Sequence, residues 1–242
     1  MAKKTKDQLV EWVIAKIDEV MPDDANGASE LLQEAPVGFI EDELDSSADF
    51  IIKNAPAELL APVIKTGEFH ATVAPGNAVD SRLVIDPTTL IGFFVLPTDF
   101  KRFMSLKISG WQKPIFELMK RDDPRYKLMH NEYRGGTWRK PQGVLIPFSR
   151  YAANEINALW TNVGLAVEIF RAKTDSDTVE YFEYIPITTA ANMPEELQDP
   201  VAWVCASRAL QILGKDQESK RAQERAEIQL QFKIGTYREN GK

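Results

Sequence analysis

The spacing of apolar residues changes twice along the chain. Apolar side chains recur every three or four positions over 8–21 and again over 39–54, which predicts two amphipathic helices. From about residue 68 to residue 185 the period shortens to two, or the apolar run is continuous as in 90–96, which predicts strands. Helical spacing then returns over 192–232. The chain therefore reads as helices, a run of strands, and helices again.

The middle region is predicted to hold about eight strands and one short helix. The helix is expected at 125–133, and residues 150–163 fit either a loop or a short helix. The strands are expected at 69–73, 81–85, 92–96, 102–109, 114–119, 143–148, 165–171 and 178–185.

Residues 192–232 predict two helices in series. Asp199 is a capping residue type and Pro200 suits the first helical position, so the first helix is expected to start there. Gly214 is placed where a left-handed residue ends a helix, and Asp216 can cap the next one. The first helix has a broad apolar face typical of a core helix, whereas the second alternates charges and is expected to end in a polar tail.

This order of elements is typical of an α+β protein. We expect the helices of the two chain ends to form one helical bundle domain, residues 1–66 with 190–242. An antiparallel β-rich domain, residues 67–189, is expected to be inserted between them.

Composition fits an ordinary soluble globular protein, with 44% apolar and 27% charged residues among 242. No apolar run is long enough to span a bilayer, and the lysines near the start are not followed by an apolar signal core. The single cysteine, Cys205, excludes an internal disulfide and lies on an apolar helix face, where a buried small side chain is expected.

Charge is divided between two blocks, although the net charge is only −7. Residues 18–52 contain eleven acidic residues and no Lys or Arg, whereas residues 101–140 contain eleven basic and four acidic residues. Blocks of opposite sign favour pairing within the chain or between copies of it. They are equally compatible with two solvated faces that never meet. An acidic protein is a poor candidate for wrapping nucleic acid, because phosphate binding depends on clustered cations.

The motifs of the common enzymes and metal sites are missing from the sequence. His70 and His130 lack metal-ligand spacing, and Gly135–Gly136 lacks the preceding strand and following helix of a phosphate-binding loop. Adjacent carboxylates at 122–123 and 41–43 do not converge on one substrate from a helix or strand. We therefore expect no enzyme, cofactor or metal site.

One loop combines residue types that are enriched at protein interfaces. Trp138 lies there among Arg134, Arg139 and Lys140. The three cations could hold a carboxylate surface of another subunit or DNA phosphate. Alternatively, Trp138 folds back onto a neighbouring strand.

Four segments carry a resemblance to a known family. They are IIKNAP at the end of the acidic helix, RFMSLKISGWQKPI, DDPRYKLMHNEYRGG, and MPEELQDPVAWVCASRALQILGK. Together with the N-terminal helix they resemble the head-to-tail connector (adaptor) proteins of tailed bacteriophages. The chain is most similar to the ring protein below the portal in crAss-like phages, and more loosely to the adaptors of podoviruses.

The resemblance implies a structural virion protein at the head–tail junction, made in the host cytoplasm. It implies a ring of twelve copies around the DNA channel, with the portal protein, downstream tail or ring proteins and passing DNA as partners, and no sequence-specific DNA binding, membrane or cofactor. The C-terminal segment 232–242 would dock on the portal, as a polar tail that orders on binding. Within it, the expected portal contacts are Phe232, Ile234, Tyr237 and Arg238.

Contacts between subunits, or with the tail, are expected from the two charged blocks. The residues concerned are Glu41, Asp42, Glu43, Arg134, Trp138, Arg139 and Lys140. The acidic residues could instead line the channel and keep DNA from adhering.

Two other classes of function stay open. One is a monomeric β-domain that binds carbohydrate or peptide in an aromatic-lined cleft, with Trp111 and Trp138 as its rings. The other is a hydrolase whose distant carboxylates meet in a pocket and have perturbed pKa values.

Overall fold

The computed structural model describes residues 3–21, 37–67, 83–131, 137–147 and 164–240. The chain forms two compact units, Met1–Val63 with Ile187–Lys242 and Ile64–Pro186, which we call the helical unit and the β unit. The divisions expected from the sequence, at 66/67 and 189/190, each lie three residues further along the chain. Helices and antiparallel sheets are both present, so the predicted α+β class is confirmed.

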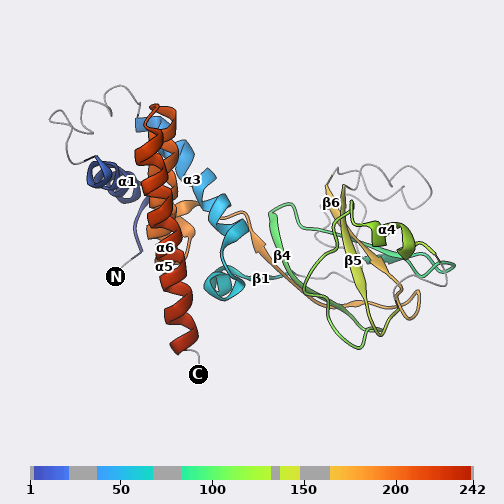
Figure 1. Ribbon diagram of the computed structural model, residues 1–242. Coiled ribbons are helices and arrows are strands. Elements are labelled where there is room, and N and C mark those ends of the chain that lie inside the picture. The colour runs from blue at the N-terminus through green and yellow to red at the C-terminus, as the bar shows by residue number, and fades with distance from the viewer. Residues whose placement is uncertain (1–2, 22–36, 68–82, 132–136, 148–163, 241–242) are drawn as a thin grey trace. The chain divides into compact units, whose positions relative to one another are not determined.

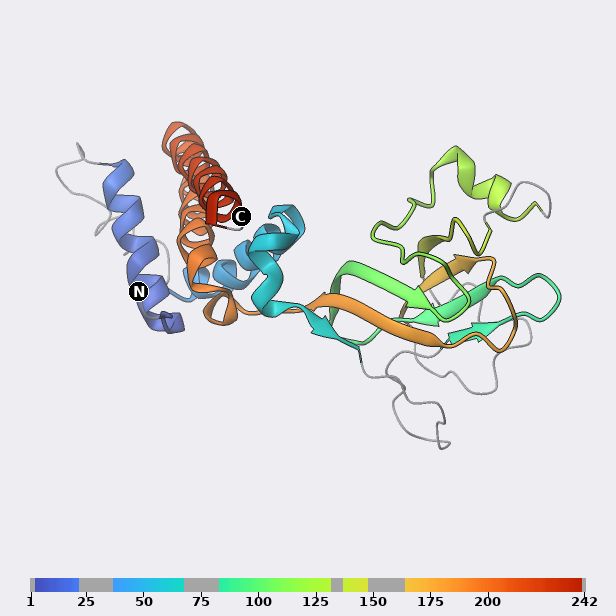
Figure 2. The ribbon, with the colours of Figure 1, turned by 90° about the horizontal axis from the view of Figure 1, so that it is seen from below.

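The helical unit is built around one buried helix. That helix, α5, packs against α1, α3 and α6, and Figures 1 and 2 show α6 running beside it. The elements are α1 (Lys6–Val20), α3 (Val37–Asn54), η1 (Ala57–Val63), η4 (Ala190–Asn192), α5 (Glu195–Ile212) and α6 (Asp216–Asn240). None of the helices in the described ranges combines the length and apolar character that a bilayer crossing needs.

The inward faces of α1 and α3 are those that helical spacing predicts. Leu9, Val13 and Ile17 of α1 are fully buried, as are Ile40 and Leu44 of α3. A capping box between Thr5 and Gln8 begins α1 two residues before the expected start. Periodic apolar positions thus identified both helices and the sides that they bury.

The predicted start of α5 is wrong. The helix begins at Glu195, and Pro200 lies inside it rather than at its first position. The apolar face extends one turn earlier than the capping residues suggested, because Leu197 and Pro200 are both buried. Asp199 does not cap the helix, since its carboxylate pairs with Lys16 of α1.

The predicted end of α5 is confirmed. Gly214 has φ +73°, the left-handed conformation that glycine adopts without a steric penalty. The Lys215 N–H donates to the Leu210 carbonyl (2.9 Å) and the Gly214 N–H to the Gln211 carbonyl (3.1 Å), which is a Schellman motif. This turn reverses the chain and sets α6 beside α5.

The expectation of a polar tail after about residue 232 is also wrong, because α6 continues to Asn240. Its sequence is rich in Gln, Glu, Lys, Arg and Ala, which favour helix. The single Gly235 costs about 1 kcal/mol in a helix, too little to end one that long.

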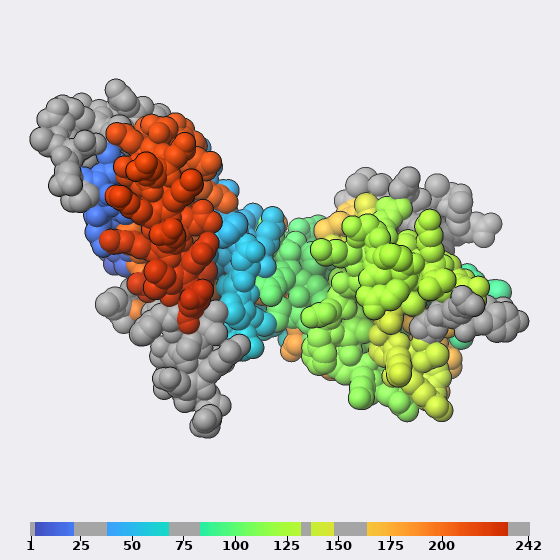
Figure 3. Space-filling view, viewed as in Figure 1, coloured from blue at the N-terminus to red at the C-terminus, as the bar shows by residue number. Residues whose placement is uncertain are grey.

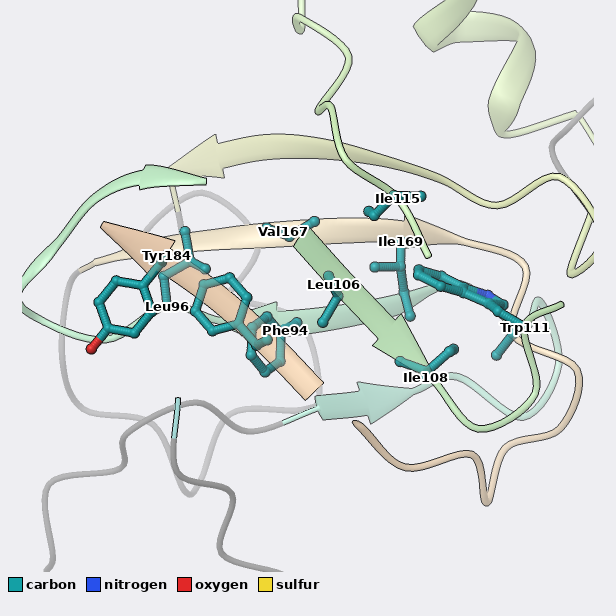
Figure 4. Close-up of a cluster of buried hydrophobic side chains, with 11 residues drawn as sticks. Phe94, Leu96, Leu106, Ile108, Trp111, Ile115, Val167, Ile169 and Tyr184 are labelled. Atoms are coloured by element: carbon teal, nitrogen blue, oxygen red, sulfur yellow. The ribbon is translucent and has the colours of Figure 1, made fainter. Parts of the chain in front are cut away.

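The β unit consists of two antiparallel sheets whose facing sides share a core. One sheet has the order β1-β7-β4 and the other β2-β3-β6-β5. The strands are β1 (Lys65–Thr66), β2 (Leu83–Ile85), β3 (Gly92–Val95), β4 (Phe100–Ile108), β5 (Gln142–Pro147), β6 (Leu165–Phe170) and β7 (Val179–Pro186), with helix α4 at Pro124–Met129. Figure 4 shows the core, in which Leu106 and Tyr184 of the first sheet meet Phe94, Val167 and Ile169 of the second.

One predicted strand, at 114–119, is wrong, and two other predicted segments are not described by the structure. The segment 114–119 is not a strand: Ile115 bridges to Leu106 of β4, whereas Met119 bridges to Val144 of β5. Its alternate apolar residues therefore serve two sheets, and neither ladder extends along it. The predictions at 69–73 and 150–163 lie outside the described residues.

The β unit begins and ends on neighbouring strands. Lys65 of β1 lies opposite Tyr184 of β7, and Thr66 lies opposite Glu183. The chain thus enters and leaves the β unit side by side, as expected of an insertion.

Candidate interaction surfaces

Most acidic residues of α3 lie outside the buried stripe of the helix, and helical spacing places Asp42 and Asp49 opposite it. We call Glu41, Asp42, Asp45 and Asp49 the acidic face of α3. Asp42 is exposed and the other three are half-buried. Phe50, 40% exposed, lies to one side of this surface, and the Arg208 guanidinium of α5 lies over its ring at 5.7 Å. Carboxylates and a partly exposed ring thus occur close together on α3, a mixture that interfaces commonly contain.

Glu43, which was predicted with Glu41 and Asp42 as a contact residue, has a partner in its own unit. Its Oε2 lies 3.1 Å from Arg208 Nη1 of α5. The Asp45 carboxylate likewise accepts the Ala190 N–H at 2.9 Å. Glu43 and Asp45 therefore hold α3 to the rest of the helical unit, and Glu41 and Asp42 are the better choice for testing a contact with another molecule.

The predicted contact loop is packed onto the β unit at its tryptophan. Trp138 is half-buried against the core, with Arg139 over its ring at 4.9 Å and Lys173 at 5.4 Å. Arg139 and Lys140 are exposed, and Arg134 lies outside the described residues. The ring thus folds back onto its own unit, which was the alternative interpretation, while Arg139 and Lys140 face solvent.

The predicted portal contacts Phe232, Ile234, Tyr237 and Arg238 fall in the last turns of α6. Their side chains lie outside the described part of the structure. With 25 residues α6 is about 38 Å long, against about 27 Å for the 18 residues of α5. Figure 1 shows the C-terminal turns of α6 extending past α5, and in Figure 3 α6 covers the face of the helical unit turned to the viewer.

A groove of about 640 Å³ opens on the β unit between β4 and the segment 116–122. We call it the basic groove, because four of its lining residues are cations and two are acids. Phe100, Phe103, Phe116, Leu118, Met119 and Leu145 supply its apolar surface, and Lys101, Arg102, Glu117, Lys120, Arg121 and Asp122 its charges.

The groove lies where the edges of the two sheets are linked. Leu106 and Ile115 exchange backbone hydrogen bonds of 3.0 and 2.9 Å, and the Met119 N–H donates to the Gly143 carbonyl at 2.8 Å. The segment between these points is therefore fixed at both ends, one on β4 and the other on β5. Phe116, 67% exposed, is held outside the core on this segment.

Beside the groove, a structural ion pair begins α4. The Asp123 carboxylate accepts the Arg125 N–H at 2.8 Å and binds the Arg125 guanidinium at 2.7 Å. The Arg125 hydrogen bonds lower the pKa of Asp123 to about 2. Asp123 is thus a helix cap, and the carboxylate pair at 122–123 does not act as one unit.

A buried carboxyl group, Glu168, lies under α4. Glu168 of β6 is 1% exposed, and its Oε2 accepts a 2.8 Å hydrogen bond from Tyr126 Oη. His130 Nε2 lies 3.6 Å from the other oxygen. Burial raises the pKa of Glu168, against the opposing effects of Tyr126, His130 and Arg121. Its neighbours are therefore a phenol, an imidazole and a guanidinium, whereas the hydrolase alternative needs a second acid.

Trp111, predicted as a ring of a binding cleft, and Cys205, predicted to be buried, are both core residues. Trp111 is 3% exposed and donates its indole N–H to the Arg171 carbonyl at 3.3 Å, so it cannot line a binding cleft. Cys205 is buried in the helical unit, and burial raises the pKa of its thiol to about 12. Among the described residues, no group of three or more His, Cys, Asp and Glu side chains could hold a metal ion.

Comparisons with protein-family models, with curated protein sequences and with solved structures find no match for this chain.

The basic groove is the surface that sequence reasoning missed. All its cations belong to the basic block, but the block was assigned to a contact through the loop at 134–140. Phe116 was placed inside an expected strand, where an aromatic residue needs no explanation. The sequence offered one signal for the groove, which was the aromatic Phe116 between Pro114 and the charged run 120–123.

Proposed function

We propose that this chain is a structural virion protein of a tailed bacteriophage, an adaptor that forms a ring of twelve copies joining the portal to the tail and continuing the DNA channel. The observation that carries the proposal is the way in which the helical unit is assembled from two separate parts of the chain. Helices from both chain ends gather around α5, and the β unit is an insertion between η1 and Ile187. This is the arrangement that the resemblance to adaptor proteins implies.

The distribution of charge supports assembly into a ring. The acidic face of α3 belongs to the helical unit and the basic groove to the β unit. A cyclic assembly is heterologous, which means that each copy presents two different and complementary surfaces to its two neighbours. Oppositely charged surfaces on different parts of one chain satisfy that requirement.

The length of α6 supports a docking role for the C-terminal residues. Helix α6 exceeds α5 by seven residues, or about 10 Å. A projecting helix can insert into a groove of another protein, a common mode of recognition. We therefore keep Phe232, Ile234, Tyr237 and Arg238 as the portal contacts and replace the disordered tail by a preformed helix.

A monomeric peptide-binding module is the second candidate, and the basic groove favours it. Its volume of about 640 Å³ and its mixture of cations and Phe side chains suit an acidic peptide. The carbohydrate version loses its support, because Trp111 is buried.

Co-purification of the full chain with the cognate portal, followed by electron microscopy, tests the proposal. We expect a closed ring of copies on the portal. A chain that fails to bind the portal and stays monomeric in its presence contradicts the proposal and favours the peptide-binding module.

A further inference from the structure

We propose that the basic groove of one copy receives the acidic face of α3 from a second copy. The inference rests on the proposed function, because it names the two surfaces through which neighbouring copies of the ring would meet.

The groove has the chemistry of a site for an acidic, partly apolar helix. Lys120 and Arg121 line the groove and are exposed, and Lys101 and Arg102 of β4 line it as well. Phe116 has two thirds of its surface in solvent, on a segment anchored at both ends. Because its backbone is fixed, the ring can bind a partner without the entropy loss of ordering a loop.

The acidic face of α3 offers the complementary groups. Asp42 and Asp49 are seven residues apart, hence two turns apart on one side of the helix. Glu41 lies next to Asp42, whereas Asp45 accepts the Ala190 N–H within its own unit. Phe50 follows Asp49 with 40% of its surface exposed. One helix thus presents carboxylates and a ring together, as helix-in-groove recognition requires.

Charge and apolar contact contribute different things to such an interface. Pairs between exposed charges contribute little affinity, but they align the two surfaces and reject surfaces of like charge. Affinity would come mainly from burying Phe50 and Phe116, because aromatic residues dominate binding energy at interfaces. The proposal therefore predicts a contact that depends on both kinds of residue.

Nucleic acid is the less suitable occupant. Glu117 and Asp122 lie among the four cations of the groove, so its charge excess is only two. Binding to a phosphate backbone depends on several cations that are not offset by nearby acids. An acidic protein surface with a ring of its own matches the groove better.

The test is self-association of the full-length chain, measured by sedimentation velocity over a range of protein and salt concentrations. We expect the wild type to associate, less so at high salt. Lys120→Glu and Asp42→Lys should each weaken association at least about tenfold, since each places like charges against one another. The double variant, Lys120→Glu with Asp42→Lys, should recover most of the lost association. Phe116→Ala should weaken association at least about fivefold at any salt concentration.

Matched controls change the same charges elsewhere. Lys113→Glu alters an exposed lysine of the β unit that does not line the groove, and Glu11→Lys alters an exposed acid of α1. Both should associate as the wild type does. Because all the substituted residues are exposed, circular dichroism should show unchanged folding in every variant.

Three results would overturn the inference. They are single variants that associate like the wild type, a double variant without recovery, and a wild type that is monomeric at the highest soluble concentration. Binding of a fluorescent DNA oligonucleotide that Lys120→Glu abolishes, with sedimentation unchanged, would assign the groove to nucleic acid and also overturn it. If rings nevertheless form on the portal, the proposed function stands and only the identity of the contact fails.

Discussion

Lys16 of α1 lies with its Nζ 2.6 Å from the Asp199 Oδ1 of α5, although only 8% of the lysine side chain is exposed. The ammonium group also lies over two indole rings, 4.8 Å from Trp12 and 4.2 Å from Trp203. A buried ammonium is tolerated when a carboxylate and aromatic faces replace its hydration. The ion pair therefore joins α1, from the N-terminal part of the chain, to the core helix α5, from its C-terminal part.

Asp199→Ala is predicted to lower the free energy of unfolding by about 3 kcal/mol, because it leaves the Lys16 ammonium buried without its carboxylate. The double variant Lys16→Met with Asp199→Ala should be more stable than Asp199→Ala alone. Urea unfolding of the full chain measures both. Asp18→Ala, which removes an exposed carboxylate of α1, is the control and should change stability by less than about 0.5 kcal/mol. Equal losses in Asp199→Ala and Asp18→Ala would contradict the role assigned to the pair.

Glu168→Gln is predicted to stabilise the protein at neutral pH. The folded state raises the pKa of Glu168 above its ordinary value of about 4.5. Stability from this group is complete below that value and is lost as pH rises through the raised pKa. Glutamine carries no charge and can still accept the Tyr126 hydrogen bond. The gain should be largest at neutral pH and vanish in acid.

Unfolding free energies measured from about pH 4, just below the ordinary pKa of Glu168, to about pH 8 decide this prediction. Glu117→Gln, at an exposed carboxylate of the same unit, serves as the control and should follow the wild-type profile. A Glu168→Gln variant that is less stable than the wild type at neutral pH would show that the ionised group is favourable there.

Gly214→Ala is predicted to destabilise the helical unit by about 1 kcal/mol, because φ is +73° at this position and a Cβ is strained there. No atom lies within 4 Å of the added Cβ, so the effect should come from the backbone alone. Gly38→Ala in α3 has equally open space and should stabilise by up to about 1 kcal/mol, because alanine favours helix. Thermal unfolding of the two variants should therefore shift in opposite directions, and a shift in the same direction would contradict the assignment.

Removal of residues 232–242 is predicted to abolish binding to the portal and to leave the remaining fold intact. The truncated α6 keeps Ser219, Ala222 and Ala226, which are buried in the helical unit. Pull-down with the portal measures binding, and circular dichroism measures folding. The quadruple substitution of Phe232, Ile234, Tyr237 and Arg238 by alanine keeps the helix and should have the same effect. Portal binding by the truncated chain would place the docking surface elsewhere.

Local sequence patterns predicted much of the helical unit. The spacing of Leu9, Val13 and Ile17 identified a face of α1, and Gly214 identified the end of α5, because both signals are contained in a few consecutive residues. Lys16 escaped the same reasoning. Its burial depends on Trp203, almost two hundred residues away, and no local pattern records that contact.

The candidate surfaces show the same limit. The sequence indicated which segments were acidic and basic. It could not indicate that Glu43 forms an ion pair with Arg208 or that Trp138 packs on its own unit. The basic groove brings Lys101 of β4 close to Lys120, and that arrangement depends on the bridges from Ile115 to Leu106 and from Met119 to Val144. One short segment that pairs with strands of two sheets is a tertiary arrangement, so periodicity does not reveal it.

The pairing of Lys65 with Tyr184 has one more consequence. Opposed residues of antiparallel strands have Cα atoms only about 5 Å apart, a gap that a two-residue hairpin can close. The two ends of the β unit are therefore as close together as the two ends of a tight turn. Cutting it out and rejoining the backbone there would leave the helices their own hydrophobic interior, and a foreign module with equally close ends could be grafted in its place.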